Sequence, residues 1–366
     1  MAENPVRSLI ENLGKELTQK PPSDRLFPYG KVQGKVIAPE NFVQILETTK
    51  PRKIAFVDGG DGILEESPNF MIILNRVYFS IFEGKKRISA SKLKQRIEFF
   101  SYVVSEVRDN DDKKTVSYNT KLFPYSKSDL VYLPDETDLE YKTDNTNVLQ
   151  ESRLVSLSRR FAEWSLAEKV ASEELNEGDI LIMDGSLQTG YKNESKYASR
   201  LYDSAQKRGV IVCGLTKSSR LIMESGEPLL ARIQEIAENV PFETWFVEIA
   251  DMASSDNRGH MLAAKFHPKS KHVFRFEILR DQFNRMDDVE KNDVLASIAA
   301  NSHDLAMPGY PYGSIDADRF AQVRKNELEM YRGLMVAEMT KVAEWKRLQK
   351  YTLTTKFHDD LNLVTS

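Results

Sequence analysis

The sequence predicts a mixed α/β sheet covered by helices, because it contains one strand–helix–strand unit and two aspartates that directly follow apolar runs. The unit consists of an apolar run at 180–184, a helical pattern at 194–208 and a second apolar run at 210–215. A short crossover of this kind favours parallel pairing of its two strands. We expect the aspartates, Asp58 and Asp184, at the carboxyl ends of strands, where open α/β sheets hold their ligands.

The N-terminal third is predicted to hold one helix and several strands. An amphipathic helix is expected at 4–19, because apolar residues recur there at helical spacing until a pair of prolines follows. The short apolar run at 53–57 indicates a buried strand that leads into a glycine-rich turn. The run at 70–82 indicates one long strand or a strand pair, whereas 91–107 fits a strand and a helix equally well.

A polar surface excursion is predicted at 109–146, a stretch rich in Asp, Asn, Lys, Ser and Thr, with short strands at 115–123 and 129–133. A long charged helix with an apolar stripe is expected after it, at 147–175. The remaining predicted elements are a helix at 227–238, a strand at 244–250, an antiparallel strand pair at 259–266 and 272–280, and helices at 285–300 and 316–348.

Length and composition indicate an ordinary globular protein. The 366 residues are long for one domain and short for three, so we expect a single domain over 1–366 that carries the N-terminal helix and the polar excursion. Hydrophobic residues make up 41% and charged residues 29%, which is typical of a globular chain. The net charge of −4 argues against a passive nucleic-acid coat protein, which is usually basic.

The sequence also limits location and metal chemistry. No apolar run approaches the roughly 18 to 20 residues of a membrane helix, and the charged N-terminus lacks the apolar core of a secretory signal. We therefore expect a cytoplasmic protein that has no membrane partner. The single cysteine, Cys213, and five scattered histidines exclude a cysteine-rich zinc site. We therefore expect carboxylates to supply most of the ligands of any bound metal.

Asp58 and Asp184 share one pattern, since each follows about four apolar residues and precedes glycine, in AFVDGG and LIMDGS. A strand holds the backbone rigidly and the glycine permits an immediate turn, so each carboxylate would be fixed at a strand end. Two such carboxylates on neighbouring strands can bind a divalent metal through hard oxygen ligands. Such a metal can polarise a phosphodiester and lower the pKa of a bound water. The alternative is a pair of ordinary strand-to-turn aspartates.

Further carboxylates are expected from two later segments. The helix SRRFAEWSLAEKVASEE offers Glu163 and Glu168, of which Glu168 continues the apolar stripe and Glu163 lies beside it. In the segment MPGYPYGSIDADRFAQV, Asp316 fits a helix N-cap. Asp318 would then lie in the first helical turn, where its carboxylate can face the cleft.

Four segments, taken in order, resemble the NurA family of nucleases. They are IAFVDGG, then RRFAEWSLA followed by ILIMDGSL, then VIVCGLTKSSRL, and finally GYPYGSIDADR. Together they extend from about residue 53 to residue 325. DGSL alone is a weak signal, whereas its combination with the preceding helix, the following lysine segment and the late Gly-Tyr-Pro-Tyr segment is specific.

The resemblance implies an RNase H-like fold, similar to the PIWI nuclease domains of Argonaute proteins. It implies a Mn²⁺- or Mg²⁺-dependent nuclease that acts on single-stranded DNA as an endonuclease and 5′–3′ exonuclease, and on duplex ends. It further implies a homodimer that docks on the hexameric translocating ATPase HerA and resects broken DNA ends for recombination, mainly in archaea.

Carried onto this chain, the resemblance implies that Asp58, Glu163 and Asp184 are catalytic metal ligands, with Glu168 as the alternate to Glu163. Lys217 ends the strand of the third segment and is a candidate to stabilise charge on the scissile phosphate. Asp318 stands where many family members have a histidine. A carboxylate can also bind the metal, but any step that needs a histidine as proton donor is in doubt.

Two other functions stay open. One is a DNA-end adaptor that regulates a HerA-type motor without cutting, which the missing histidine and the negative net charge favour. The other is a phosphohydrolase of small phosphates, which is disfavoured because the sequence has no glycine-rich phosphate loop of the P-loop kind. Tyr310 and Tyr312 are candidates for base stacking or for core packing.

Overall fold

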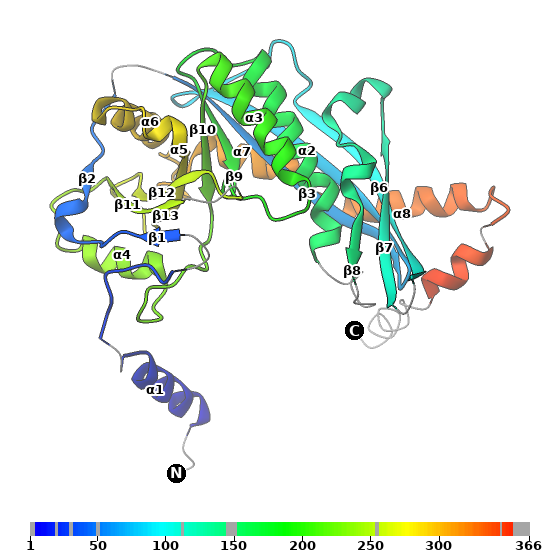
Figure 1. Cartoon of the computed structure of the whole chain (residues 1–366), viewed down its shortest axis with the longest axis horizontal. Coiled ribbons are helices and arrows are strands. Elements are labelled where there is room, and N and C mark those ends of the chain that lie inside the picture. Colours follow the sequence, from blue (N-terminus) through cyan, green and yellow to red (C-terminus); the bar gives the residue numbers. More distant parts are fainter. Residues whose placement is uncertain are drawn as a thin grey trace.

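A mixed sheet of thirteen strands runs through the part of the chain that the computed structural model describes (Figure 1). The described residues are 4–18, 21–28, 32–48, 52–110, 113–143, 152–252, 256–344 and 346–353. The strands are β1 (Val32–Gly34), β2 (Val43–Gln44), β3 (Lys53–Ser67), β4 (Phe70–Glu83), β5 (Lys86–Ile88), β6 (Arg96–Asn110), β7 (Lys113–Pro124), β8 (Tyr141–Thr143), β9 (Ile180–Asp184), β10 (Ile211–Thr216), β11 (Trp245–Met252), β12 (Gly259–Lys265) and β13 (Phe274–Leu279). Their order is β1-β11-β12-β13-β10-β9-β3-β4-β6-β7-β8, with β2 paired to β11 and β5 paired to β4.

Helices cover both faces of this sheet, and one further helix, α1 (Pro5–Thr18), lies apart from it (Figure 1). The other helices are α2 (Ser152–Glu173), α3 (Glu194–Arg208), α4 (Leu229–Ala237), α5 (Arg280–Phe283), α6 (Asp288–Ala300), α7 (Tyr312–Ala321) and α8 (Lys325–Met339), with 3₁₀ turns η1 (Pro39–Asn41), η2 (Lys127–Tyr132) and η3 (Glu136–Leu139). Among the described helices, none has both the length and the apolar character that a membrane span requires. The architecture confirms the predicted mixed α/β sheet flanked by helices.

The centre of the sheet is parallel and its flanks are antiparallel. β9 pairs in parallel with β10 on one side and with β3 on the other. The other described strand pairs are antiparallel. β9, α3 and β10 therefore form the strand–helix–strand unit that the sequence predicted. This arrangement brings the carboxyl ends of β9 and β10 beside the middle of β3.

Alternation along β3 separates two cores, because successive strand side chains point to opposite faces. Ala55 and Val57 pack against α2 and α3 in one core. Ile54 and Phe56 pack against α6 and α7 in the other. Figure 1 shows α2 and α3 in front of β3, with α7 behind it. β3 is thus covered on both faces, and the middle of this strand is where helices from the two layers meet.

Helix α1 lies apart from the sheet (Figure 1). Its apolar side chains have exposed fractions between 52% and 69%, and they are Val6, Leu9, Ile10, Leu13 and Leu17. The helix itself matches the prediction for 4–19. Its apolar stripe stays open to solvent in this chain, because it does not join the protein's own core.

The structure corrects the prediction for the segment that follows 53–57. The chain does not turn at the glycines after Asp58, since β3 continues to Ser67 in register with β4. The predicted turn was wrong because glycine there serves close packing rather than a change of direction. A Cβ on Gly60 would lie 2.2 Å from the carbonyl oxygen of Ala321 in α7.

The predicted helix at 316–348 is also corrected, because the chain there forms two helices separated by residues 322–324. The guanidinium of Arg76 donates a 2.5 Å hydrogen bond to the Gln322 carbonyl, and Glu327 accepts from the Arg324 amide at 2.9 Å to begin α8. α7 starts at Tyr312, so Asp316 is an interior helix residue and not an N-cap.

Smaller differences concern the edge of the sheet. Residues 91–107, which fitted a strand or a helix, hold most of the long strand β6, which runs from Arg96 to Asn110, and 70–82 is one strand rather than a pair. The predicted strand at 129–133 is wrong, because η2 occupies it after a Ser126 side-chain cap. The short strand β8 was not predicted. Residues 144–146, the end of the polar excursion, and 147–151, the start of the predicted helix at 147–175, lie outside the described residues.

We predict that Gly60→Ala destabilises the protein by about 1 to 3 kcal/mol, because the added methyl group meets backbone atoms of α7 that cannot rotate away. The measurement is the free energy of unfolding in guanidinium chloride. Gly333→Ala in α8 is the control, since its Cβ meets nothing within 4 Å and alanine favours a helix. A Gly60→Ala protein as stable as wild type would contradict the packing described.

Candidate active site

Asp58 lies in the middle of β3, at the point where its neighbour β9 ends. β3 pairs with β9 only through Val57, which is opposite Met183. Beyond that pair the edge of β3 is no longer covered by β9. The Asp58 side chain is 8% exposed, and its Oδ1 accepts a hydrogen bond of 2.7 Å from the Gly59 amide. A carboxylate is therefore fixed and largely buried beside the gap that the end of β9 leaves.

The glycine after Asp58 makes room for a second carboxylate. A Cβ on Gly59 would lie 2.2 Å from Oε1 of Glu163, which projects from α2. Glu163 is 5% exposed. The Asp-Gly-Gly sequence thus admits α2 through Gly59 and α7 through Gly60, and both helices approach the strand at Asp58.

Asp184 and Lys217 reach the site from the carboxyl ends of β9 and β10. Asp184 is the last residue of β9, and Gly185 turns the chain away with a φ of +105°, which L side chains rarely adopt. Lys217 directly follows β10. The predicted carboxylate at a strand end with a glycine turn is correct for Asp184.

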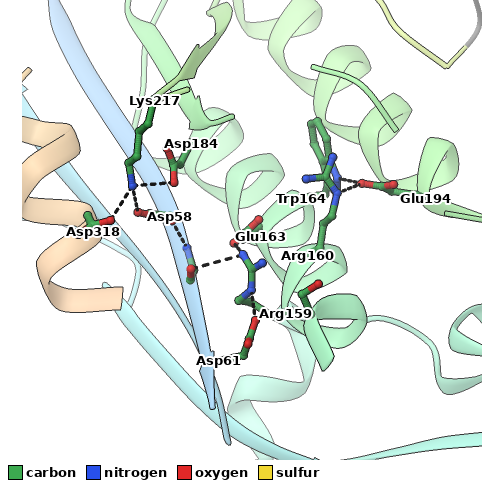
Figure 2. A network of polar contacts seen from close by, with 12 residues as sticks. Asp58, Asp61, Arg159, Arg160, Glu163, Trp164, Asp184, Glu194, Lys217 and Asp318 are labelled. Atoms are coloured by element: carbon green, nitrogen blue, oxygen red, sulfur yellow. Dashed lines mark hydrogen bonds and ion pairs between the residues drawn. The ribbon is translucent and has the colours of Figure 1, made fainter. Parts of the chain in front are cut away.

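Lys217 gathers three carboxylates around its ammonium group (Figure 2). Its Nζ lies 3.0 Å from Oδ2 of Asp184, 2.5 Å from Oδ1 of Asp318 and 3.5 Å from Oδ2 of Asp58. Asp318 comes from α7, so its side chain does face this group, although from the second turn of the helix rather than the first. Strands β3, β9 and β10 and helix α7 thus converge on one charged cluster.

Arg159 holds Glu163 in place from the same helix. The two side chains form an ion pair one turn apart, and Nε of Arg159 also lies 2.6 Å from Oδ2 of Asp61 on β3 (Figure 2). Sequence reasoning missed Arg159 and Asp61. The signal was present, because arginine precedes glutamate by four positions in RRFAE, which is the spacing of a helical ion pair.

Charge is unevenly balanced in this cluster. Burial, and then the neighbouring charge of Asp184, raise the pKa of the Asp58 carboxyl to about 8. Burial also raises the pKa of Glu163, although Arg159 opposes this shift. Burial tends to lower the pKa of Lys217, but Asp58 and Asp184 outweigh it and raise that pKa. Without a further cation, the cluster therefore holds more negative charge than Lys217 and Arg159 neutralise.

These residues fit a divalent metal by the chemistry of their donor atoms. Asp58, Glu163 and Asp184 supply hard oxygen ligands, and a bound cation would oppose the burial and the charge of Asp184 that raise the pKa of Asp58. Within the described residues, no three Asp, Glu, His or Cys side chains already converge as a closed metal-binding group. Binding would therefore require the carboxylates to close around the ion.

The structure does not bring Glu168 to this cluster. Its Oε1 accepts a hydrogen bond of 3.0 Å from the Ser204 hydroxyl on α3, on the helical layer away from Lys217. Tyr310 is buried near Lys217, and its pKa is raised chiefly by burial. Tyr312 packs partly buried against the core of α6 and α7. Glu163 rather than Glu168 thus lies beside Asp58.

A second buried carboxylate fixes the turn that follows Asp184. Glu194 accepts hydrogen bonds from the Gly190 and Tyr191 amides at 2.6 and 3.0 Å, and from Nε1 of Trp164 at 2.8 Å (Figure 2). Arg160 completes this group by donating to the Gln188 carbonyl. Helix α2, which carries Glu163, is therefore tied to the segment that follows Asp184.

The fold and the site define the class of protein, an α/β protein with carboxylates clustered around the carboxyl end of its central parallel strand β9. Residues 52–221 match the NurA domain family, so this part of the chain belongs to that family. This membership supports a nuclease. None of the curated proteins matches the chain.

Two solved structures are similar. The crystal structure of the NurA nuclease from Sulfolobus solfataricus aligns with a TM-score of 0.54 at 14% identity, covering 93% of this chain and 96% of that chain. This likeness shows the fold. A structure of Aa-Ago with externally bound siRNA aligns with a TM-score of 0.25 at 11% identity, covering 72% of this chain and 27% of that chain.

We predict that Asp58→Asn raises the stability of the metal-free protein at pH 8 by about 1 to 3 kcal/mol. The pKa of Asp58 is raised from 3.8 to about 8 in the folded chain, so the folded state keeps a proton that the unfolded chain releases. The free energy of unfolding therefore falls as the pH rises through this window. Asparagine cannot ionise, and the difference between variant and wild type should narrow towards pH 4.

The measurement is denaturant unfolding in EDTA between pH 4 and 8. The control is Asp203→Asn on α3, where the side chain is exposed and the substitution should leave the pH dependence unchanged. A variant less stable than wild type at pH 8 would contradict the charge imbalance described.

Proposed function

We propose that this protein is a metal-dependent deoxyribonuclease that cleaves phosphodiesters of single-stranded DNA and of duplex ends. The observation that carries the proposal is the meeting of Asp58, Glu163 and Asp184 around the end of β9, with Lys217 among them. Such a carboxylate group beside a lysine suits the binding of a divalent cation and an anionic substrate.

Each residue of the group has a distinct proposed role. Asp58, Glu163 and Asp184 would hold Mn²⁺ or Mg²⁺, which supplies a polarised phosphate and an activated water when bound. Lys217 would donate to a phosphate oxygen and stabilise the charge that develops on it. Asp318 orients Lys217 through the 2.5 Å contact and is itself a further candidate ligand. Arg159 positions Glu163.

The wider setting of this activity is also a proposal. Membership of the NurA family supports a role in DNA end resection for recombination, as an endonuclease on single strands and a 5′–3′ exonuclease, together with a hexameric HerA-type ATPase. A homodimer is consistent with α1, whose apolar stripe lies open to solvent. Covering such a stripe by another chain would remove apolar surface from water.

A second candidate function rests on Lys217. Its ammonium group already pairs with Asp184 and Asp318, so the chain itself supplies one positive charge to this cluster without a metal. This arrangement favours a DNA-end adaptor that regulates the motor without cutting. The two functions differ in whether the purified chain cleaves DNA at all.

We predict that Asp58→Ala and Glu163→Gln each lower the rate of metal-dependent DNA cleavage by at least about a hundredfold, because each removes one ligand of the metal. The measurement uses labelled single-stranded and blunt duplex DNA with Mn²⁺, Mg²⁺ or EDTA. Glu168→Gln is the matched control, since Glu168 lies on the same helix but contacts Ser204, and its rate should stay near that of wild type.

Full activity of either variant would contradict the assignment of that residue to the active site. A wild-type protein that cuts neither substrate alone, nor with a HerA-type partner added, would favour the adaptor instead. Cutting that begins only with the partner would keep the nuclease and show that the motor is required.

We predict that Leu9→Ser combined with Leu13→Ser lowers the molecular mass in solution from dimer to monomer, if the stripe of α1 is the surface that pairs two chains. Both side chains are more than half exposed, so the substitutions should leave the unfolding transition in place. The measurement is light scattering at several protein concentrations. A dimer that persists in this variant would place the contact elsewhere.

A further inference from the structure

A cavity of about 550 Å³ opens directly beside the candidate active site. It shares Lys217 and Asp318 with the carboxylate cluster. Its remaining walls come from three segments, which are the turn at 269–272 with the start of β13, the loop at 306–310, and Ile315 of α7. The cavity is thus continuous with the place where the phosphodiester would be cut.

The two loops that form the cavity are held together tightly. The Ser270 hydroxyl donates to the His272 carbonyl at 2.8 Å and accepts from the His272 amide at 3.1 Å. A Cβ on Gly309 would lie 2.6 Å from Oγ of Ser270. The φ of Gly309 is +92°, so glycine is suited to this close approach in conformation as well. The walls are therefore preformed rather than assembled around a ligand.

Positive charge is in excess on the lining of this cavity. Lys217, Lys269 and Lys271 line it, and the only carboxylate among the described lining residues is Asp318, which already pairs with Lys217. Lys269 and Lys271 are exposed, and neither forms an ion pair within the described residues. These two ammonium groups are available to an anion.

The floor of the cavity is apolar. The rings of Phe274 and Tyr310 lie 5.5 Å apart, and both side chains are buried. Met307 adds a thioether at the rim with an exposed fraction of 54%. Proteins usually bind single strands with two elements. Lysines bind the phosphates, and apolar or aromatic surfaces beside them cover the bases.

We propose that this cavity binds one unpaired nucleotide of a DNA strand, next to the phosphodiester that is cleaved. Lys269 and Lys271 would bind its backbone phosphates, and Met307 with the Phe274–Tyr310 floor would cover its base. The volume lies within the ~300–1,000 Å³ range of small-ligand sites, which suits one nucleotide rather than a base pair with both its backbones. This inference rests on the proposed nuclease function and names the form in which the substrate enters.

The test is the binding of fluorescein-labelled oligothymidylate, measured by anisotropy in EDTA over a series of salt concentrations. Lys269→Gln combined with Lys271→Gln should weaken binding about tenfold or more at low salt. Loss of two phosphate contacts should also lower the slope of log affinity against log salt by about 1.4, since each contact to a single strand contributes about 0.7. The matched control is Lys192→Gln with Lys207→Gln, two exposed lysines at the α3 side of the sheet.

A second variant tests the base. Met307→Ser should weaken binding of oligothymidylate several-fold with the salt slope unchanged, because it removes an apolar contact and no charge. The same variant should bind an abasic strand, which lacks the bases, with the affinity of wild type. A Met307→Ser defect that is equally large on the abasic strand would overturn the base contact.

The outcomes separate this inference from the nuclease function, because EDTA prevents metal-dependent cutting during the binding measurement. An unchanged salt slope in the Lys269/Lys271 variant, or an equal fall in the control pair, would overturn the inference even if wild type cuts DNA. A reduced slope confined to the Lys269/Lys271 variant would support the inference even if wild type proves to be the silent adaptor.

Discussion

The structure around the site depends on the burial of one carboxylate in the middle of a strand. Asp58 can lie there because Gly59 and Gly60 have no side chains, so α2 and α7 approach β3 closely on either side of it. Larger residues would keep Glu163 and the C-terminal end of α7 away from the strand. The same glycines that place the charges together also remove water from them, which is why burial is the main cause of the raised pKa of Asp58.

This concentration of like charge costs stability and is offset by nearby cations. Lys217 lies among Asp58, Asp184 and Asp318, whereas Arg159 lies between Glu163 and Asp61. Each cation has raised affinity for its proton because of the carboxylates around it. After burial, the charge of Asp184 is the next cause of the raised pKa of Asp58, and Lys217 offsets it only in part. A cluster with excess negative charge favours the binding of a divalent ion, and its lysine could then move from the carboxylates to a phosphate.

The cavity lies on one side of the carboxylate cluster. The carboxylates lie at the end of β9, and the cavity lined by Lys269 and Lys271 opens on the side of Lys217 and Asp318. Lys217 is common to both, so a strand held in the cavity would present its phosphate to the same ammonium group that orders the carboxylates. Under the proposed function, DNA binding and cleavage would share this one lysine, and they can be tested apart because Lys269 and Lys271 line the cavity alone.

Much of this was accessible from the sequence. The βαβ unit, Asp184 with its glycine turn, the helix that carries Glu163 and the lysine after β10 all follow from local patterns of apolar spacing and turn residues. The glycines after Asp58 were misread as a turn, because glycine gives the same local signal where it bends a chain and where it admits a neighbouring helix. Arg159 was overlooked, although its four-residue spacing from Glu163 was visible.

By itself, then, the sequence determined which residues could form strands, which helix carried the glutamates, and that carboxylates rather than cysteine or histidine would supply any metal ligands. Only the tertiary structure decided between Glu163 and Glu168, because the choice depends on which side of α2 meets β3 and which meets α3. Only the tertiary structure brought Lys269 and Lys271 beside Lys217, about fifty residues away along the chain. The physical reason is that spacing along a chain fixes local geometry, whereas contacts between distant elements arise from packing that no single segment encodes.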